Sequence, residues 1–292
     1  MKYRHRFHAG NFADVHKHVT LVALLQAMQR KDKGLFYFET HAGRGWYSGH
    51  GDSQPGSEIR EGYARLAGST PQSDAIRQFL DTESAACAAL TPDKPQPRAG
   101  SAYAGSPLLA ATLLREQDRG LCCELLAPEC RALQQSLHAW PRMRTLCADG
   151  LQSLRSQFPP RERRALLLID PPYEDPLAEL DTALSAALEA LTRLAGTVVA
   201  LWYPIKDDRL LAPWLRRCAA RLRAPTLQCE LWRHPRDSRV ALNGSGLLII
   251  NAPWQLDTQM QQWLPELGTL LGIDAQGGTA VRWLVQESGA AQ

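Results

Sequence analysis

Seven short apolar runs, separated by helical patterns, limit the possible folds of this chain more than any other feature. The runs cover 35–40, 121–125, 145–149, 165–170, 197–203, 226–232 and 246–252, and the helical patterns cover 12–30, 106–118, 128–138, 150–157, 177–194 and 207–222. Several runs are continuously apolar, which is typical of strands covered on both faces of a parallel sheet. The alternation predicts a Rossmann-like α/β fold with seven mostly parallel strands and helices on both faces.

One long segment interrupts this alternation. Residues 45–105 separate the first strand from the helix that should follow it, and they contain a helical piece around Asp74–Leu90. Because a structureless loop of that length is improbable in a compact domain, we expect a small helical insertion over the mouth of the sheet. The next helix should begin with Ser106 as N-cap and Pro107 in its first turn. The chain therefore divides into 1–44 (N-terminal arm, first helix and first strand), the insertion 45–105, and the rest of the main domain, 106–287.

The composition indicates a soluble globular protein, with 45% apolar and 22% charged residues. No apolar run approaches the ~20 residues of a membrane helix. The basic start MKYRHRFHAG is not followed by the apolar stretch of a signal peptide, so we expect a cytoplasmic protein. The seven cysteines include no CxxC pair, and Cys122, Cys123 and Cys147 lie in strand-like runs. We expect them to be free and buried, in a reducing compartment.

The small net charge of +3 conceals two basic segments. Residues 1–33 carry seven Lys and Arg against two Asp, and residues 206–239 carry nine against four acids. Such segments favour a polyanionic partner, because phosphate neutralisation releases counterions. Solvated surface charge explains them equally well.

The ends of the predicted strands carry the candidate ligand-binding residues, because open α/β sheets bind ligands at the carboxyl ends of their strands. The first strand ends in ETHAGRG, where Gly43 permits a close approach to a ligand. The second ends at Glu124, placed to accept from ribose hydroxyls. The third ends at Asp149-Gly150, placed to accept from an adenine amino group. Each alone also fits an ordinary strand end; together they predict an adenosine pocket.

The fourth strand ends in Asp170-Pro171-Pro172-Tyr173, the most specific motif in the chain. The exocyclic amine of adenine is a weak nucleophile, since its lone pair is conjugated with the ring. The Asp170 carboxylate and a carbonyl of the stiff Pro171-Pro172 segment can accept its two N–H bonds and free that lone pair for attack on a methyl sulfonium. Tyr173 is expected to offer a face for stacking an unpaired base. The motif predicts methylation of an adenine N6 amine.

The N-terminal segment holds six of the eight histidines within the first 50 residues. His16 and His18 suggest a metal site, but a spacing of two on a helix places them on different faces, and no Cys or carboxylate set completes a coordination shell. We therefore expect no metal. Lys17 and His18, near the start of the first helix, can line the cofactor or RNA site. Tyr3, Arg4 and Arg6 can stack on and clamp a nucleotide.

The motifs together resemble the RlmJ family of bacterial 23S ribosomal RNA adenine-N6 methyltransferases. The resemblance rests on YRHRFHAGNFADVHKH, ETHAGRG, YAGSPLLA, LLREQD, LLLIDPPYE, ALWYPI and SGLLIINAPW, and so covers nearly the whole chain. It implies S-adenosyl-L-methionine as cofactor, Asp170 as the catalytic residue and Tyr3 as a contact of the substrate adenosine. Around the cofactor it implies Lys17 or His18, His41, Ser106, Glu124, Asp149 and Gly150. It also implies a monomer acting on 23S ribosomal RNA before assembly into particles.

Three other functions fit parts of the sequence. DNA adenine-N6 methyltransferases use the same tetrapeptide, but they normally need a further region to read duplex DNA, for which only 45–105 is available. A Rossmann dehydrogenase would show GxGxxG followed by an acid about 20 residues later. A non-enzymatic RNA-binding module would not require Asp170-Pro171-Pro172-Tyr173.

Overall fold

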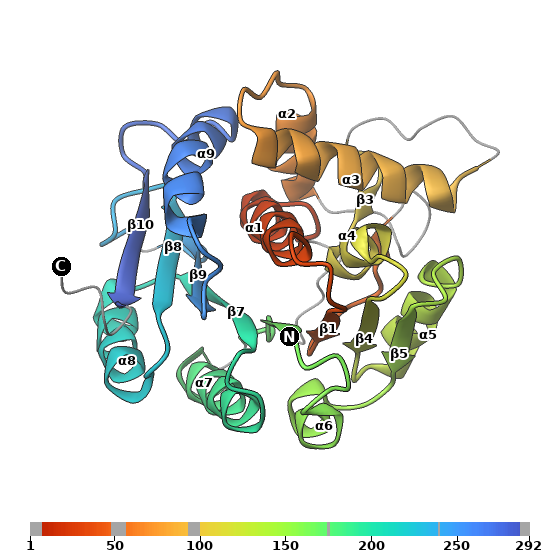
Figure 1. Ribbon diagram of the computed structural model, residues 1–292. Helices are drawn as coiled ribbons and strands as arrows, with labels where there is room; N and C mark the ends of the chain where they lie inside the picture. Colours follow the sequence, from red (N-terminus) through yellow and green to blue (C-terminus); the bar gives the residue numbers. More distant parts are fainter. Residues whose placement is uncertain (1–7, 48–56, 93–99, 174–175, 239, 287–292) are drawn as a thin grey trace.

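A central sheet of eight strands organises the chain, whose computed structural model describes residues 8–47, 57–92, 100–173, 176–238 and 240–286 (Figure 1). The strand order is β10-β8-β9-β7-β6-β1-β4-β5. The strands are β1 (Phe36–Glu39), β4 (Arg119–Cys123), β5 (Met143–Leu146), β6 (Ala165–Ile169), β7 (Val198–Ile205), β8 (Thr226–Trp232), β9 (Gly244–Ile250) and β10 (Gly278–Val285).

Five neighbouring strands, β5, β4, β1, β6 and β7, run parallel. β9 runs antiparallel to both β7 and β8, and β10 runs antiparallel to β8. The mostly parallel α/β sheet is thereby confirmed, but the predicted count of seven strands is one too low. The strand that was missed, β10, is an edge strand whose residues are nearly all half-exposed, so its sequence lacks the continuous apolar character of the inner strands.

Helices cover both faces of the sheet, because successive residues of each strand point to opposite sides. Phe36 and Phe38 pack with α6 (Gly150–Gln157), α7 (Pro176–Arg193) and α8 (Asp208–Arg221). Tyr37 packs on the other side with α1 (Phe12–Gln29), α4 (Ser106–Leu113) and α9 (Leu256–Leu270). Leu133 of α5 (Ala127–Ser136) joins the same side. The six predicted helices are all present, while α9 was not expected because Pro265 lies inside it.

The described residues of the segment 45–105 lie mainly in helices. It contains the 3-10 helix η3 (Ser57–Arg60), α2 (Tyr63–Ala67) and α3 (Asp74–Leu90), and its ends are joined by the antiparallel strands β2 (Trp46–Tyr47) and β3 (Tyr103–Ala104). α3 packs against α1, α4 and α9 (Figure 1). Its side chains Ile76 and Phe79 belong to the same apolar cluster as α1, so the division of the chain at 45 and 105 stays a prediction.

Helix α1 is unusual in being buried on every side. All residues from Phe12 to Leu25 are buried, among them Asp14, His16 and Lys17. Asn11 caps the helix by accepting from the backbone N–H groups of Ala13 and Asp14 at 3.0 and 2.9 Å. Polar side chains on such a helix must find partners inside the protein, because unpaired buried polar groups are costly.

The expectation that Cys147 is free is wrong. Cys130 of α5 and Cys147, which follows β5, form a disulfide with their Cα atoms 5.7 Å apart. The sequence could not show this pairing, because a separation of 17 residues carries no signal until α5 is folded against β5. Cys87, Cys122, Cys123, Cys218 and Cys229 are free and buried. None of the described helices combines the length and apolarity that a membrane crossing requires.

Candidate functional site

The predicted site residues meet at one edge of the sheet, where the parallel strands β1, β4, β5 and β6 end. Asp170 directly follows β6, Glu124 directly follows β4, and Asp149 lies three residues beyond β5. The register pairs Glu39 at the end of β1 with Cys122 and Leu168 on its two neighbours, so these strand ends lie side by side. This juxtaposition is the one that the sequence predicted.

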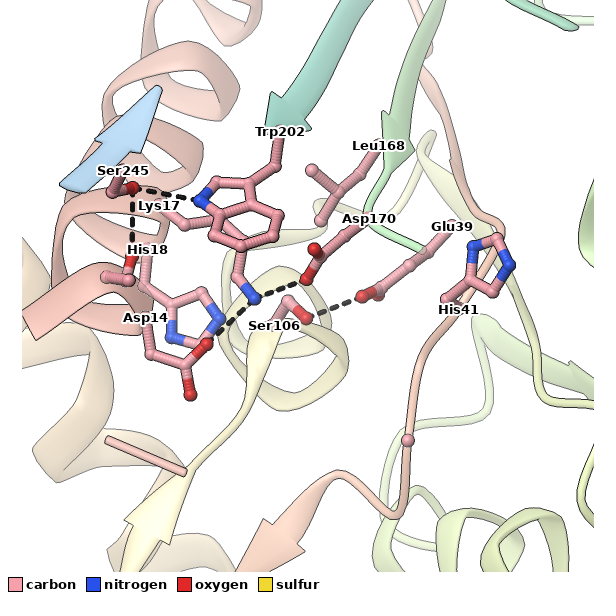
Figure 2. Close-up of polar contacts among 12 residues, drawn as sticks. Asp14, Lys17, His18, Glu39, His41, Ser106, Leu168, Asp170, Trp202 and Ser245 are labelled. Carbon is pink, nitrogen blue, oxygen red and sulfur yellow. Dashed lines mark hydrogen bonds and ion pairs between the residues drawn. The ribbon is translucent and has the colours of Figure 1, made fainter. Parts of the chain in front are cut away.

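Glu39, which was not predicted as a site residue, lies buried beneath the site at the end of β1. Its carboxylate is buried and accepts from the Ser106 hydroxyl at 2.5 Å and from the Tyr37 hydroxyl at 2.8 Å (Figure 2). Burial raises the pKa of Glu39 to about 7. The expected N-cap role of Ser106 is wrong, because Gly105 is the N-cap of α4 and the Ser106 hydroxyl is turned to Glu39.

The glycine loop after β1 is tied to Glu124. Gly43 has φ +62°, a conformation that suits glycine, and its N–H donates to Glu124 Oε2 at 2.9 Å. The N–H of Leu126 donates to Oε1 of the same carboxylate at 2.7 Å. Glu124 thus fixes the loop that was predicted to approach the ligand.

Asp149 and Gly150 bring the end of β5 against the end of β1. Asp149 caps α6 by accepting from the backbone N–H groups of Leu151 and Gln152 at 2.9 and 3.1 Å. A Cβ at position 150 would lie 2.1 Å from the Thr40 carbonyl oxygen, so only glycine fits there. The two loops therefore touch through backbone atoms.

His41 belongs to the loop after β1, near Asp149 and Asp170. Its Nδ1 is 2.8 Å from the Thr40 hydroxyl. Burial lowers the pKa of His41, while the nearby charges of Asp170 and Asp149 act in the opposite direction. His41 is therefore near both carboxylates, and its lowered pKa favours the neutral imidazole at neutral pH.

A buried row of three charges, Asp14–Lys17–Asp170, joins α1 to the end of β6. Lys17 Nζ donates to Asp14 Oδ1 at 2.8 Å and to Asp170 Oδ2 at 2.5 Å, and its side chain is only 5% exposed (Figure 2). Burial alone lowers the pKa of Lys17, but the two carboxylates outweigh it and the pKa is raised. Lys17 therefore stays protonated and holds the Asp170 carboxylate in position.

Tyr173 is not placed as expected. Its side chain is buried, being 3% exposed, so the predicted stacking face is not available in this structure. The Tyr173 hydroxyl donates to the carbonyl oxygen of Trp202, and the two rings are 5.5 Å apart. The backbone at Tyr173 has φ +53°, a strained value for a bulky residue, and the buried ring holds the turn in that conformation.

Trp202 of β7 is a site residue that sequence reasoning missed. The register pairs Ile169 with Leu201, which places Trp202 beside Asp170. Its indole N–H donates to the Ser245 hydroxyl at 2.8 Å, and Lys17 Nζ lies 5.9 Å from the ring centre (Figure 2). Trp202 is only partly buried, so it supplies the aromatic surface near Asp170 that was assigned to Tyr173. The only signal was a tryptophan in an apolar strand, which core packing also explains.

The two helical histidines diverge, as their spacing predicted. His16 contacts the Ser245 hydroxyl at 2.9 Å and Cys229 Sγ at 3.2 Å, and burial lowers its pKa to about 3. His18 Nδ1 lies 2.5 Å from the Tyr103 hydroxyl on another side of α1. Among the residues that the structure describes, no group of three or more His, Cys, Asp and Glu side chains could hold a metal ion. Tyr3, Arg4 and Arg6 lie outside the described residues.

The described residues fit S-adenosyl-L-methionine by the chemistry of their donor and acceptor groups. Glu124 and Asp149 place carboxylate oxygens at adjacent strand ends, where hydroxyl and amino groups of an adenosine can donate. Gly43 and Gly150 allow close packing at this edge of the sheet, since a Cβ would lie 2.7 Å from the Tyr47 hydroxyl oxygen and 2.1 Å from the Thr40 carbonyl oxygen, respectively. Asp170 adds negative charge next to them, which suits a positively charged sulfonium.

A Rossmann-like sheet with acids at successive strand ends and Asp-Pro-Pro-Tyr after β6 defines a methyltransferase. Residues 32–285 match the family model described as "Ribosomal RNA large subunit methyltransferase D, RlmJ". The chain belongs to this RlmJ family of methyltransferases.

Individual relatives agree with this assignment. The chain is similar to a protein named "Ribosomal RNA large subunit methyltransferase J" in Haemophilus influenzae, at 35% identity over 98% of this chain and 100% of the relative. It is also similar to the protein of the same name in Escherichia coli, at 36% identity with the same coverage. A crystal structure of a Legionella pneumophila protein is 29% identical and has a TM-score of 0.82, covering 94% of this chain and 98% of that one.

Proposed function

We propose that this protein transfers a methyl group from S-adenosyl-L-methionine to the N6 amine of an adenosine in 23S ribosomal RNA. One observation carries the proposal: the Asp170 carboxylate at the end of β6, held by Lys17 and followed by the Pro171–Pro172 turn that Tyr173 anchors. The names of the two relatives, both large-subunit ribosomal RNA methyltransferases, support RNA rather than DNA as the substrate.

Asp170 and the proline turn activate the amine by accepting its two hydrogens. Lys17 contacts Oδ2, and among the described residues no other protein donor is seen on Asp170, so Oδ1 can accept one N–H bond. The backbone carbonyl of Pro171 is proposed to accept the other. These two hydrogen bonds draw the nitrogen toward tetrahedral geometry and localise its lone pair for in-line attack. Because the acceptors are fixed before the substrate arrives, much of the rate comes from positioning.

The strand-end residues are proposed to hold the cofactor. Glu124 would accept from the ribose hydroxyls and Asp149 from the adenine amine, with Gly43 and Gly150 against the nucleoside and Ser106, His41, His18 and Lys17 around the rest. S-adenosyl-L-methionine supplies an electrophilic methyl group when it is bound.

The proton released after transfer needs no strong base. The methylated nitrogen is acidic, and the Asp170 carboxylate is already hydrogen bonded to it. Lys17, fixed between Asp14 and Asp170, holds that carboxylate where it can accept the proton. We place Trp202 beneath or beside the target base, since its partly exposed indole lies next to Asp170.

The finer points of the proposal concern the form of the substrate. We infer a monomeric, cytoplasmic enzyme that acts on free or early-assembly RNA, because unstacked bases are extracted at low cost from single strands and loops. Tyr3, Arg4 and Arg6 would contact this RNA from the N-terminal arm.

The test uses the purified protein with radiolabelled S-adenosyl-L-methionine. Unmodified 23S RNA, 16S RNA, assembled large subunits and duplex DNA are incubated separately. We expect label in 23S RNA, recovered as N6-methyladenosine after nuclease digestion. Label found only in DNA would contradict the RNA substrate.

A matched variant tests the role of Asp170. Asp170→Asn keeps the size of the side chain but removes the negative charge, so turnover should fall by at least ~100-fold, as when a preorganised transition-state partner is lost. Cofactor affinity, measured by calorimetry, should change little. Full activity in this variant would overturn the mechanism.

A further inference from the structure

A cluster of arginines lies at the edge of the sheet opposite the proposed catalytic site, where the parallel strands begin. The chain enters β4, β5 and β6 through three separate loops, and each loop is rich in arginine. Together, 114–119, 141–144 and 161–164 contain seven arginines against three acids: Arg115, Arg119, Arg142, Arg144, Arg161, Arg163 and Arg164.

Backbone hydrogen bonds bring these loops side by side. The N–H of Phe36 donates to the Arg164 carbonyl at 2.9 Å, and the N–H of Arg119 donates to the Leu35 carbonyl at 3.0 Å. The N–H of Gly120 donates to the Arg142 carbonyl at 2.9 Å. Arginines from three loops that are far apart in the sequence therefore form one surface, which none of the short charged runs indicates by itself.

Two of the three acids are buried and neutralise the inner arginines. The side chain of Glu162, 5% exposed, accepts from Arg119, whose guanidinium also lies 4.2 Å from the centre of the Phe36 ring. Glu162 accepts one further hydrogen bond from Arg161, which otherwise belongs to the outer, exposed group. Asp118, which is fully buried, accepts from Arg115. The inner arginines are thus fixed in place by partners behind them.

The outer arginines remain exposed to solvent. Arg142, Arg144, Arg161 and Arg163 are all exposed, and the side chain of Arg161 is 81% exposed. The third acid, Glu116, lies 3.8 Å from Arg142, too far for a close ion pair. A hollow of about 500 Å³ opens between these loops and is lined by Arg119, Arg142, Arg144 and Arg161, together with Glu116 and Asp118.

We propose that this arginine-lined hollow is a second RNA-binding surface, which contacts phosphates of the same 23S ribosomal RNA away from the target adenosine. The inference rests on the proposed function. A phosphodiester backbone presents a negative charge at each nucleotide. Separate, outward-facing guanidiniums match such a backbone better than they match a single buried anion.

The position of the hollow determines which RNA can reach it. β4 has five residues, so at ~3.4 Å per residue the two edges of the sheet are separated by about 17 Å or more. A short oligonucleotide at Asp170 cannot span that distance around the protein. A long, folded RNA can span it, so we expect the hollow to contribute to the binding of long RNA and not of short oligonucleotides.

The test compares a triple variant, Arg142→Gln/Arg144→Gln/Arg161→Gln, with a control of equal charge change, Arg216→Gln/Arg217→Gln/Arg221→Gln. The control residues are exposed on α8, against the other half of the sheet (Figure 1). They belong to the basic segment 206–239, so the control also tests whether the charge of that segment binds RNA or is solvated surface charge. Binding of full-length 23S RNA and of a short single-stranded oligonucleotide containing adenosine is measured across a series of KCl concentrations. Thermal unfolding verifies that both variants are folded.

For the long RNA, the hollow variant should bind about tenfold more weakly at moderate salt, and the slope of log Kd against log salt should fall by about 2, as expected for three lost phosphate contacts. The oligonucleotide affinity, and kcat on either RNA, should match those of the unsubstituted protein. The control variant should keep the original slope.

Three results would overturn the proposal. An unchanged slope in the hollow variant would show that no phosphate is bound there, while methylation of 23S RNA would still support the proposed function. If the control variant lost as much affinity for 23S RNA, the effect would come from total charge and not from the hollow. If the hollow variant lost as much affinity for the oligonucleotide, the arginines would act at the catalytic site. If the unsubstituted protein methylates no 23S RNA, the proposed function fails first.

Discussion

Replacing Lys17 with methionine should destabilise the protein strongly and in a pH-dependent way. Methionine keeps most of the length of the side chain but removes the charge from the buried row Asp14–Lys17–Asp170. The two carboxylates, with side chains 6% and 16% exposed, then lack the cation that each contacts. They remain close together without the Lys17 charge that both contact.

The magnitude follows from the two contact distances. At 2.8 and 2.5 Å, each ion pair has a Coulomb energy of about 6 kcal/mol at an effective dielectric constant of 20. Most of this is offset by the free energy of taking Lys17 out of water. Breaking a buried pair by removing one partner typically costs about 3–5 kcal/mol, and we expect a loss in that range at neutral pH.

The sign of the pH dependence is opposite to that of an ordinary carboxylate. Without Lys17, the pKa of the carboxylate pair in the folded variant rises above the unfolded value of about 4. A group with a raised folded pKa contributes stability at low pH that is lost as the pH increases through the folded pKa. The variant's deficit in free energy of unfolding, relative to the unsubstituted protein, should therefore be smaller at pH 5 than at pH 8.

Urea unfolding of both proteins at pH 5 and pH 8 measures this deficit. Adding Asp170→Asn to the Lys17→Met variant removes one of the stranded charges and should recover part of the lost stability, chiefly at pH 8. A deficit below about 1 kcal/mol, equal at both pH values, would refute the account of a buried charge row.

Three further predictions concern neighbouring features. Gly150→Ala should lower stability by at least ~2 kcal/mol and weaken cofactor binding in calorimetry, because its Cβ would meet backbone atoms at 2.1 Å; Gly196→Ala, with nothing within 4 Å, is the neutral control. Trp202→Ala should raise the Kd for a substrate oligonucleotide by roughly 10- to 100-fold through lost stacking, and Trp202→Phe should restore most of it; unchanged affinity in the alanine variant would exclude a stacking role. Reducing Cys130–Cys147 should cost about 3 kcal/mol for a loop of 17 residues, and an unfolding midpoint that dithiothreitol does not shift would contradict this.

The inner strands were predictable because their burial shows in their own residues. A strand such as β6, with five fully buried apolar residues, shows its burial directly in the sequence, and its carboxyl end then locates Asp170. β10 and α9 were missed because their signals are mixed: one is a half-exposed edge strand and the other contains Pro265. Their formation depends on the surface that β8 offers them.

The site was most predictable where its residues follow a strand. Lys17 of the first helix was expected near the site, but its contact with Asp170 was not. Glu124, Asp149 and Asp170 follow from strand positions, whereas the partners of Asp170 come from elsewhere in the chain. Lys17 reaches it across 153 residues, and the Tyr173–Trp202 contact depends on the register of β6 with β7. The inward turn of Tyr173 is a matter of packing, and the tetrapeptide itself is compatible with either direction.

The complete burial of α1 has a consequence for the order in which the site forms during synthesis. The helix that carries Lys17 leaves the ribosome before α3, α4 and β9, on which it packs, and His16 meets Ser245, which is made 229 residues later. Until β9 has emerged, one side of α1 has no partner, and neither the Ser245–Trp202 hydrogen bond nor the His16 contact can exist. A nascent chain that ends before residue 244 therefore contains Asp170 and the two proposed cofactor acids, Glu124 and Asp149, without a finished site.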